Sequence, residues 1–348
     1  MKTISNLSEE LKINQHSNLA LDSFKLSING AEKYAENMTN NADTKKDFFI
    51  REIDGILSRK NTPIRVCDIW CCSGSLISVI KQHFKEKIIA IWIDISPNMI
   101  KMAKKSYKWI SFHVGNAYFT PKLADASVDV ILWSSLLHEL GSYYDKSFTH
   151  ESYNLGIKTW LCEANRLLSK WGTLLIKDPV KPLNWDKWVI LKNKHSNIAP
   201  KIDISDINSL RWQFISPSEL PIQTRIEVFV KNFPWNKDSN TVVSNGNIHT
   251  TRAMTSEIAR HIPLPISDTW EHFIDEQDEW YGSWNENDWN IYERTSWKMQ
   301  VQEHKISFSH SNHAAKIKDD FELFDIYGNS LLFENILPTH QFTILNKN

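Results

Sequence analysis

A carboxylate, a turn of small residues and the start of a helical pattern follow one another within residues 66–80. Asp68 stands in the apolar run VCDI, Gly74 ends the turn, and the apolar residues after it recur at helical spacing. In a parallel sheet, this order places a carboxylate and a helix N-terminus at the edge where open α/β sheets bind nucleotides. The segment therefore predicts one wall of a nucleotide-binding crevice.

A second acid stands where the next apolar run ends. Asp94 closes IIAIWID, and Ser96 and Pro97 follow it as a typical helix start. An acid in this position accepts hydrogen bonds from the ribose hydroxyls of an adenosine. A capping or turn role accounts for either acid alone, but two acids in this order around a small-residue turn are much less expected by chance. The pair favours an adenosine-containing ligand.

Short apolar runs alternate with helical patterns through the first half of the chain. This alternation is typical of a parallel sheet with helices on both faces, and it predicts a doubly wound α/β core. After Asp178 the alternation stops, and the stretch that follows is too long for a loop, which favours a subdomain or lid. The expected strands cover residues 64–69, 87–94, 110–114, 128–133 and 172–178, and the expected helices lie near residues 48–57, 75–85, 97–107 and 150–168.

The order of these motifs resembles class I S-adenosylmethionine-dependent methyltransferases. That family has D-x-G-x-G-x-G after its first strand, an acid ending the second, an acid with a small residue after the third, and a glycine turn before the fifth. The matching segments here are residues 68–74, Asp94, residues 115–117, residues 127–140 and residues 167–178, and residues 321–346 resemble the closing antiparallel hairpin.

The resemblance implies an α/β fold: a Rossmann-like, doubly wound seven-stranded sheet with a C-terminal antiparallel hairpin and a large insert after strand five. Its parts would be an N-terminal helical cap at residues 1–45, a methyltransferase core at residues 46–180 and 320–348, and an insert or lid at residues 181–319. The implied activity is methyl transfer to a small molecule or to an exposed group of a macromolecule. The acceptor and the oligomeric state stay open.

The resemblance also implies S-adenosyl-L-methionine as the cofactor. Asp68 and Gly74 would line its methionine end, and Asp94 would hold the ribose. Asn116 and Ala117 would meet the adenine. The complete implied set of cofactor-binding residues is Asp68, Trp70, Cys72, Gly74, Asp94, Ile95, Asn116, Ala117 and Ser134, the last of which lies near the start of the substrate face.

Tryptophan occupies three positions where the resemblance expects glycine. Trp70 replaces the first loop glycine, Trp92 a glycine two residues before the acid, and Trp171 the first glycine of the turn before the fifth strand, while Cys72 replaces a further loop glycine. One hypothesis is a degenerate methyltransferase fold that serves as a binding scaffold. The other is a gene that reads UGA as glycine although the sequence is written with tryptophan. The chain's 10 glycines and 15 tryptophans fit the second hypothesis.

Three polar residues near the expected fourth and fifth strands are candidates for catalysis. The methyl carbon of a sulfonium is already activated, so the protein mainly positions the acceptor and removes its proton. His138 and Glu139 follow the fourth strand, and Asp178 ends the fifth. His138 is the better base because the ordinary pKa of histidine lies near about 6.5. Packing or helix capping is the alternative explanation for each of them.

The overall composition gives few indications of partners. The net charge of −1 supplies no general attraction for nucleic acid, and no pattern of metal ligands stands out. An N-terminus without a signal-peptide core and the lack of a long apolar stretch predict a cytoplasmic protein that does not span a membrane. A nicotinamide-dependent oxidoreductase is the alternative enzyme class, although the loop opens with Asp68 and lacks a G-x-x-G spacing.

Overall fold

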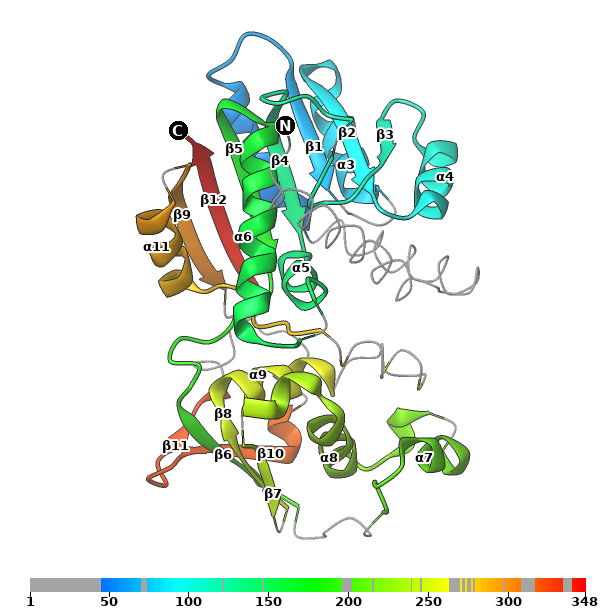
Figure 1. Cartoon of the computed structure of the whole chain (residues 1–348), viewed down its shortest axis with the longest axis vertical. Helices are drawn as coiled ribbons and strands as arrows, with labels where there is room; N and C mark the ends of the chain where they lie inside the picture. Colours follow the sequence, from blue (N-terminus) through cyan, green and yellow to red (C-terminus); the bar gives the residue numbers. More distant parts are fainter. Residues whose placement is uncertain are drawn as a thin grey trace, which may run out of the picture.

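The structure, a computed structural model of the whole chain, contains two lobes stacked along its long axis (Figure 1). One lobe is built on a sheet of seven strands and the other on a sheet of five. Among the described residues, no helix is long and apolar enough to cross a membrane. The described residues are 45–69, 74–120, 122–145, 147–195, 202–214, 216–238, 240–244, 246–262, 270, 273, 277, 279–296, 298–307, 317–333 and 340–348.

Some sequence predictions fall outside these residues. The expected helical cap at residues 1–45 does so except for its last residue, Lys45, which begins a helix at residues 45–57. Trp70 and Cys72, two of the implied cofactor-binding residues, also lie outside the described part of the chain.

The larger sheet confirms the predicted Rossmann-like architecture. Its strand order is β3-β2-β1-β4-β5-β12-β9. The first five strands in this order pair in parallel, and β12 pairs antiparallel with both β5 and β9. The strands are β1 (Ile64–Ile69), β2 (Ile88–Asp94), β3 (Ser111–Val114), β4 (Val128–Ser134), β5 (Leu168–Asp178), β9 (Met299–Ser307) and β12 (His340–Lys347).

Helices cover both faces of this sheet because side chains alternate between the faces along each strand. Val66 and Trp92 pack on one face with the helix at residues 45–57 and with α3 and α4. Cys67 and Ile69 pack on the other face with α5 and α6. The helices, with a short 3-10 turn, are α3 (Ser75–Phe84), η1 (Lys85–Lys87), α4 (Pro97–Ser106), α5 (Leu137–Ser142) and α6 (His150–Leu167).

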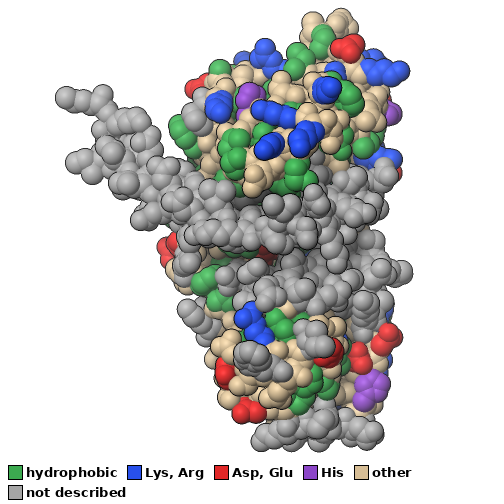
Figure 2. Space-filling view, turned by 90° about the vertical axis from the view of Figure 1, so that its right-hand side faces the viewer, with side chains coloured by type: hydrophobic (Ala, Val, Ile, Leu, Met, Phe, Trp, Pro, Cys, Tyr) green, Lys and Arg blue, Asp and Glu red, His purple; other side chains and the backbone are tan. Residues whose placement is uncertain are grey.

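The sequence of α4 shows how one helix face is selected for burial. Met99, Ile100 and Ala103 recur at helical spacing and are buried. The helix surface that remains is basic, and Figure 2 shows Lys and Arg side chains gathered on this lobe. The exposed lysines of α4 and the turn after it are Lys101, Lys104, Lys105 and Lys108.

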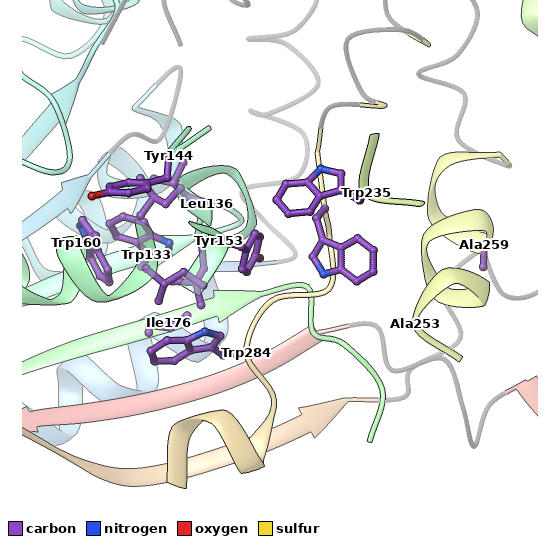
Figure 3. Close-up of a cluster of buried hydrophobic side chains, with 14 of the residues drawn as sticks. Trp133, Leu136, Tyr144, Tyr153, Trp160, Ile176, Trp235, Ala253, Ala259 and Trp284 are labelled. Atoms are coloured by element: carbon purple, nitrogen blue, oxygen red, sulfur yellow. The ribbon is translucent and has the colours of Figure 1, made fainter. Parts of the chain in front are cut away.

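The smaller lobe is an antiparallel sheet with the order β11-β10-β6-β8-β7, accompanied by α7, α8 and α9 (Figure 1). One continuous hydrophobic cluster joins it to the larger lobe, from Trp133 through Tyr153 to Trp235 (Figure 3). The elements are β6 (Trp188–Asn193), α7 (Ile207–Gln213), η2 (Pro217–Glu219), α8 (Ile222–Asn232), η3 (Pro234–Asp238), β7 (Val242–Ser244), β8 (Asn247–Thr251), α9 (Arg252–His261), β10 (Phe321–Asp325) and β11 (Ser330–Leu331).

The predicted closing hairpin at residues 321–346 is wrong in its first strand. β10 pairs with β6 and β11 in the smaller sheet, so it does not belong to the core. Its place beside β12 is taken by β9, which comes from within the expected insert and carries α11 (Glu286–Thr295) against it. The sequence of β9, MQVQEHKIS, is mostly polar because the strand forms the edge of its sheet, and it therefore gives a weak strand signal.

Trp171 adopts a backbone conformation that favours glycine. Its φ is +65° and its side chain is 68% exposed. A Cβ atom crowds the backbone in this left-handed region at a cost of roughly 1–2 kcal/mol, which glycine avoids. The position therefore has the geometry of the glycine that the motif expects there.

Three other tryptophans are buried without a hydrogen-bond acceptor. Trp92, Trp133 and Trp160 are each 0% exposed, and their Nε1 atoms have no partner among the described residues. The rings of Trp133 and Trp160 have centroids 3.5 Å apart at an angle of 48° (Figure 3). The tilt brings their edges closer than the roughly 3.5–4.0 Å of ordinary carbon contacts. Other buried tryptophans donate their N–H groups, namely Trp270, Trp280, Trp284 and Trp289.

Candidate functional site

Gly74 forms the turn from the β1 loop into α3. It is the N-cap of that helix with a φ of +71°, a left-handed conformation that glycine adopts without strain. A Cβ atom at this position would lie 3.4 Å from the Trp92 ring, within ordinary contact distance. Gly74 and Ser75 are buried, and the N–H groups and dipole of the helix that starts there suit an anionic group.

Asp68 and Asp94 lie on neighbouring strands and on the same face of the sheet. Asp68 pairs in register with Trp92, so its side chain points to the same side as that of Asp94, two residues further along β2. Both carboxylates are almost completely buried, Asp68 at 0% and Asp94 at 2% exposure. Two acids therefore flank the point where β1 and β2 give way to α3 and α4.

The start of α4 holds Asp94 in place. The Asp94 Oδ1 atom accepts a hydrogen bond of 2.8 Å from the Ser96 backbone N–H. Ser96 is the N-cap of α4, its Oγ accepts from the Met99 N–H, and Pro97 occupies the first turn. Ile95, the residue between them, is buried. The predicted helix start after the second acid is confirmed, and it fixes the direction of that acid.

The turn after β3 brings Asn116 and Ala117 together. The Asn116 Oδ1 atom accepts a hydrogen bond of 2.9 Å from the Tyr118 N–H, and its backbone oxygen accepts from Phe119. Because this side-chain oxygen already accepts a hydrogen bond within the turn, it is a poorer hydrogen-bond partner for the adenine ring than the sequence analysis expects. Ala117 is buried, and Gly115 donates its N–H to the Asp94 backbone oxygen, which ties the turn to the end of β2.

Asp178 fixes both α5 and the ring of His138. Its carboxylate accepts hydrogen bonds from the backbone N–H groups of Leu136 at 2.5 Å, Leu137 at 2.7 Å and His138 at 3.3 Å. The same carboxylate lies 3.0 Å from His138 Nδ1. An ionised carboxylate only accepts hydrogen bonds, so Nδ1 carries the hydrogen of a neutral ring and Nε2 carries the lone pair. Asp178 is thus a positioning group for His138.

Two further predicted residues lie beside this pair. Glu139 belongs to α5 and is 9% exposed, directly after His138. Ser134 ends β4 and is 5% exposed, and its Oγ has no hydrogen-bond partner among the described residues. The structure therefore gathers the ends of β4 and β5 and the first turn of α5 into one buried polar group.

A segment of the insert completes this group, and sequence reasoning missed it. Residues 279–285, here called the strap, run in extended form past the ends of β4 and β5. Glu279 Oε2 lies 3.7 Å from His138 Nε2, and Tyr143 donates a 2.7 Å hydrogen bond to Glu279 Oε1. The Tyr281 ring stacks on the His138 ring with centroids 4.6 Å apart. The imidazole is thus enclosed by groups from both lobes.

Several hydrogen bonds fix the strap to both lobes. Trp280 donates its backbone N–H to Ser142 Oγ at 2.8 Å, and Ser283 donates its hydroxyl to the Pro179 carbonyl. From the insert, Arg260 donates to the backbone oxygens of Tyr281 and Val180 at 2.8 and 3.0 Å. Burial lowers the pKa of Arg260 below its ordinary value. Glu279 and Tyr281 are therefore held on an ordered frame.

Glu257 and His261 of α9 form a second buried pair behind the strap. Glu257 is 0% exposed, and its Oε2 atom accepts a 3.0 Å hydrogen bond from the Tyr281 N–H. His261 Nε2 lies 3.4 Å from the same oxygen, and the His261 ring meets the Tyr281 ring edge-on at 5.0 Å. Glu257 Oε1 has no hydrogen-bond partner among the described residues. Among the residues that the structure describes, no group of three or more His, Cys, Asp or Glu side chains could hold a metal ion.

One family model matches part of the chain. A family model described as a methyltransferase domain matches residues 60–217, which include the five parallel strands and the residues around Asp68, Asp94 and His138. No curated protein matches the chain.

Several solved methyltransferases match this chain at low identity. An S-adenosylmethionine-dependent methyltransferase from Methanosarcina mazei is 12% identical, with 84% of this chain and 96% of that chain covered and a TM-score of 0.43. The plantazolicin methyltransferase BpumL, in complex with a pentazolic desmethylPZN analog and SAH, is 14% identical over 98% and 99%, with a TM-score of 0.43. A TehB-like enzyme from Corynebacterium glutamicum is 19% identical over 43% and 73%, with a TM-score of 0.32. Likeness of this degree assigns no substrate to this chain.

Proposed function

We propose that the chain transfers a methyl group from S-adenosyl-L-methionine to an acceptor held at the strap, in line with the match of a methyltransferase-domain model to residues 60–217. The observation that carries the proposal is the placement of Asp68 and Asp94 on one face of the sheet, on either side of the Gly74 turn. A nucleotide-type ligand binds at this edge of an open α/β sheet.

The residues around the turn fit an adenosyl cofactor. Gly74 caps the α3 N-terminus in a left-handed conformation, and the N–H groups and dipole there favour the anionic carboxylate of a methionine group. Asp94 is fixed by Ser96 and suits the ribose hydroxyls, while Asn116 and Ala117 belong to a turn tied to the same strand and suit the adenine. We assign Asp68, Trp70, Cys72, Ile95 and Ser134 to the same site.

The acceptor side of the site contains a base. When bound, the cofactor supplies a methyl group already activated by its sulfonium. The chain's own contribution is to orient the acceptor, exclude water and take up a proton. His138 suits the last task because Asp178 holds its Nδ1–H, which leaves Nε2 as the basic atom. Glu139 lies beside it, and Asp178 acts through His138.

Calorimetric titration with S-adenosylmethionine, S-adenosylhomocysteine and reduced nicotinamide dinucleotide tests the proposal. The first two are expected to bind and the nicotinamide cofactor is not. Asp94→Asn removes the charge that suits the ribose hydroxyls and is expected to weaken binding by roughly 10–100-fold, the effect of about 1.5–3 kcal/mol for hydrogen bonds to a charged group. Asp186→Asn, an exposed acid before β6, is the matched control.

Two results would contradict the proposal. Binding of the nicotinamide dinucleotide instead of the sulfonium cofactor would favour an oxidoreductase. A non-catalytic scaffold would be favoured if neither sulfur compound binds to the protein as written or to its Trp70→Gly, Trp92→Gly, Trp171→Gly variant.

A further inference from the structure

Three carboxylates, those of Asp178, Glu279 and Glu257, lie around the strap and contact the His138 ring or the Tyr281 backbone. Asp178 contacts His138 at 3.0 Å, and Glu279 lies 3.7 Å from the other nitrogen of that ring. Tyr281 stacks on His138 and donates its backbone N–H to Glu257. Carboxylates from β5, the strap and α9 therefore lie around one histidine–tyrosine pair.

Negative charge exceeds positive charge in this group of residues. The only guanidinium among its described members, Arg260, donates to two backbone carbonyls at 2.8 and 3.0 Å, and its charge also interacts with Glu257 and Asp178, so one guanidinium charge faces three carboxylates. Asp178 is satisfied by backbone N–H groups, whereas Glu257 Oε1 is buried without a hydrogen-bond partner in the described part of the chain. A buried carboxylate oxygen in this state is stabilised by a donor that arrives with positive charge.

Resting on the proposed function, we propose that the methyl acceptor is an amine, whose nitrogen binds beside His138 and the Glu279 carboxylate, while Glu257 adds negative charge from behind Tyr281. An ammonium group supplies hydrogen-bond donors to Glu279, and aromatic rings beside the site attract a cation. A neutral hydroxyl or a thiol would leave the excess negative charge uncompensated. The insert thus acts as the specificity element of the enzyme.

The same residues account for the proton balance of transfer to nitrogen. The amine binds as a cation and passes one proton to Nε2 of His138, where the Glu279 carboxylate stabilises the imidazolium. The nitrogen lone pair then forms a bond with the methyl carbon, and the carbon–sulfur bond breaks with its electron pair going to sulfur. The methylated nitrogen keeps its remaining protons and leaves as an ammonium, and His138 returns its proton to solvent. The products are a methylated ammonium and S-adenosylhomocysteine.

Binding of benzylamine and benzyl alcohol to the protein saturated with S-adenosylhomocysteine tests this inference. The two probes have nearly the same shape, but only benzylamine is charged near neutral pH. Benzylamine is expected to bind about tenfold more tightly than the alcohol. Glu279→Gln and Glu257→Gln are expected to remove this preference, and Glu279→Asp to retain much of it. Glu322→Gln, at an exposed position of β10, is the matched control and is expected to change nothing.

Binding of S-adenosylhomocysteine to each variant reports whether the fold is intact, and it separates the two proposals. If S-adenosylhomocysteine binds but the alcohol binds as well as the amine, or the preference survives in both glutamine variants, the amine assignment is wrong and the proposed function stands. If S-adenosylhomocysteine binds neither to the chain as written nor to its Trp70→Gly, Trp92→Gly, Trp171→Gly variant, the proposed function fails and this inference fails with it.

Discussion

Replacing Trp171 by glycine and by alanine isolates the conformational cost of its positive φ. Both variants lose the indole ring and its contact with the Lys170 ammonium, 5.1 Å from the ring centroid, so these losses cancel in the comparison. Alanine keeps a Cβ atom in the left-handed region, which costs roughly 1–2 kcal/mol. Glycine avoids this cost but loses about 0.4–1 kcal/mol through the greater freedom of its unfolded chain. The glycine variant is therefore expected to be more stable by about 1 kcal/mol.

Trp188 provides the matched control. It is also exposed, at 40%, but it lies in β6 with ordinary strand geometry. Glycine in a strand is less stable than alanine by about 0.5–1 kcal/mol, so the sign of the difference is expected to reverse between positions 171 and 188. The assay is urea unfolding, with the midpoint and slope measured for all four variants. A glycine variant at position 171 that is no more stable than the alanine variant would refute this reasoning.

The same position decides the hypothesis of recoded glycine. Trypsin cleaves after Lys170 and Lys177, and it therefore releases the peptide WGTLLIK from the sequence as written. If UGA is read as glycine, the peptide isolated from the natural source is lighter by the difference between a tryptophan and a glycine residue. UGG codons at positions 70, 92 and 171, or a peptide with the mass of the written sequence, would exclude recoding.

Three further predictions concern buried polar groups. Asp178→Asn leaves the backbone donors of α5 facing an amide, and it is expected to cost about 3 kcal/mol of stability, seen as a lower urea midpoint; an unchanged midpoint would show that these contacts contribute little. Burial and Lys45 lower the pKa of Lys177 from 10.5 to about 8. Between these two pH values the folded state binds fewer protons than the unfolded state, so the free energy of unfolding is expected to rise with pH above about 8. Lys177→Met should remove this pH dependence and add about 3 kcal/mol of stability below pH 8, and an equal pH dependence in both proteins would contradict the assignment. Trp289→Phe removes one of the two donors to Gln341 Oε1, the other being the Thr343 hydroxyl, and is expected to cost about 0.5–1.5 kcal/mol more than Trp133→Phe, which removes an N–H group without a partner among the described residues. Equal costs in urea unfolding would argue against this.

The sequence was sufficient where local chemistry determines structure. Gly74 and the Ser96-Pro97 helix start are positions at which residue type and backbone geometry are directly linked, and both turns form as expected. The parallel strands were predictable because they are buried on both faces and appear as continuous apolar runs. β9 was missed because a polar edge strand lacks that pattern.

The proposed acceptor half of the site was not predictable from local patterns. Glu279 and Tyr281 contact His138 from 141 and 143 positions further along the chain, and Glu257 lies on α9 in the smaller lobe. The acidic-aromatic stretch at residues 275–289 stands out in composition, but composition alone does not tell a solvated loop from an ordered strap. The hydrogen bonds of Arg260 and Ser283, which distinguish the two, join residues far apart in the chain.

A crystal structure with bound S-adenosylhomocysteine tests the central assignment most directly. The ribose hydroxyls are expected within hydrogen-bond distance, about 2.5–3.2 Å, of the Asp94 carboxylate, with the methionine end at the Gly74 turn and the sulfur facing His138. A ligand bound away from β1 and β2, or Asp68 and Asp94 facing separate cavities, would contradict the account.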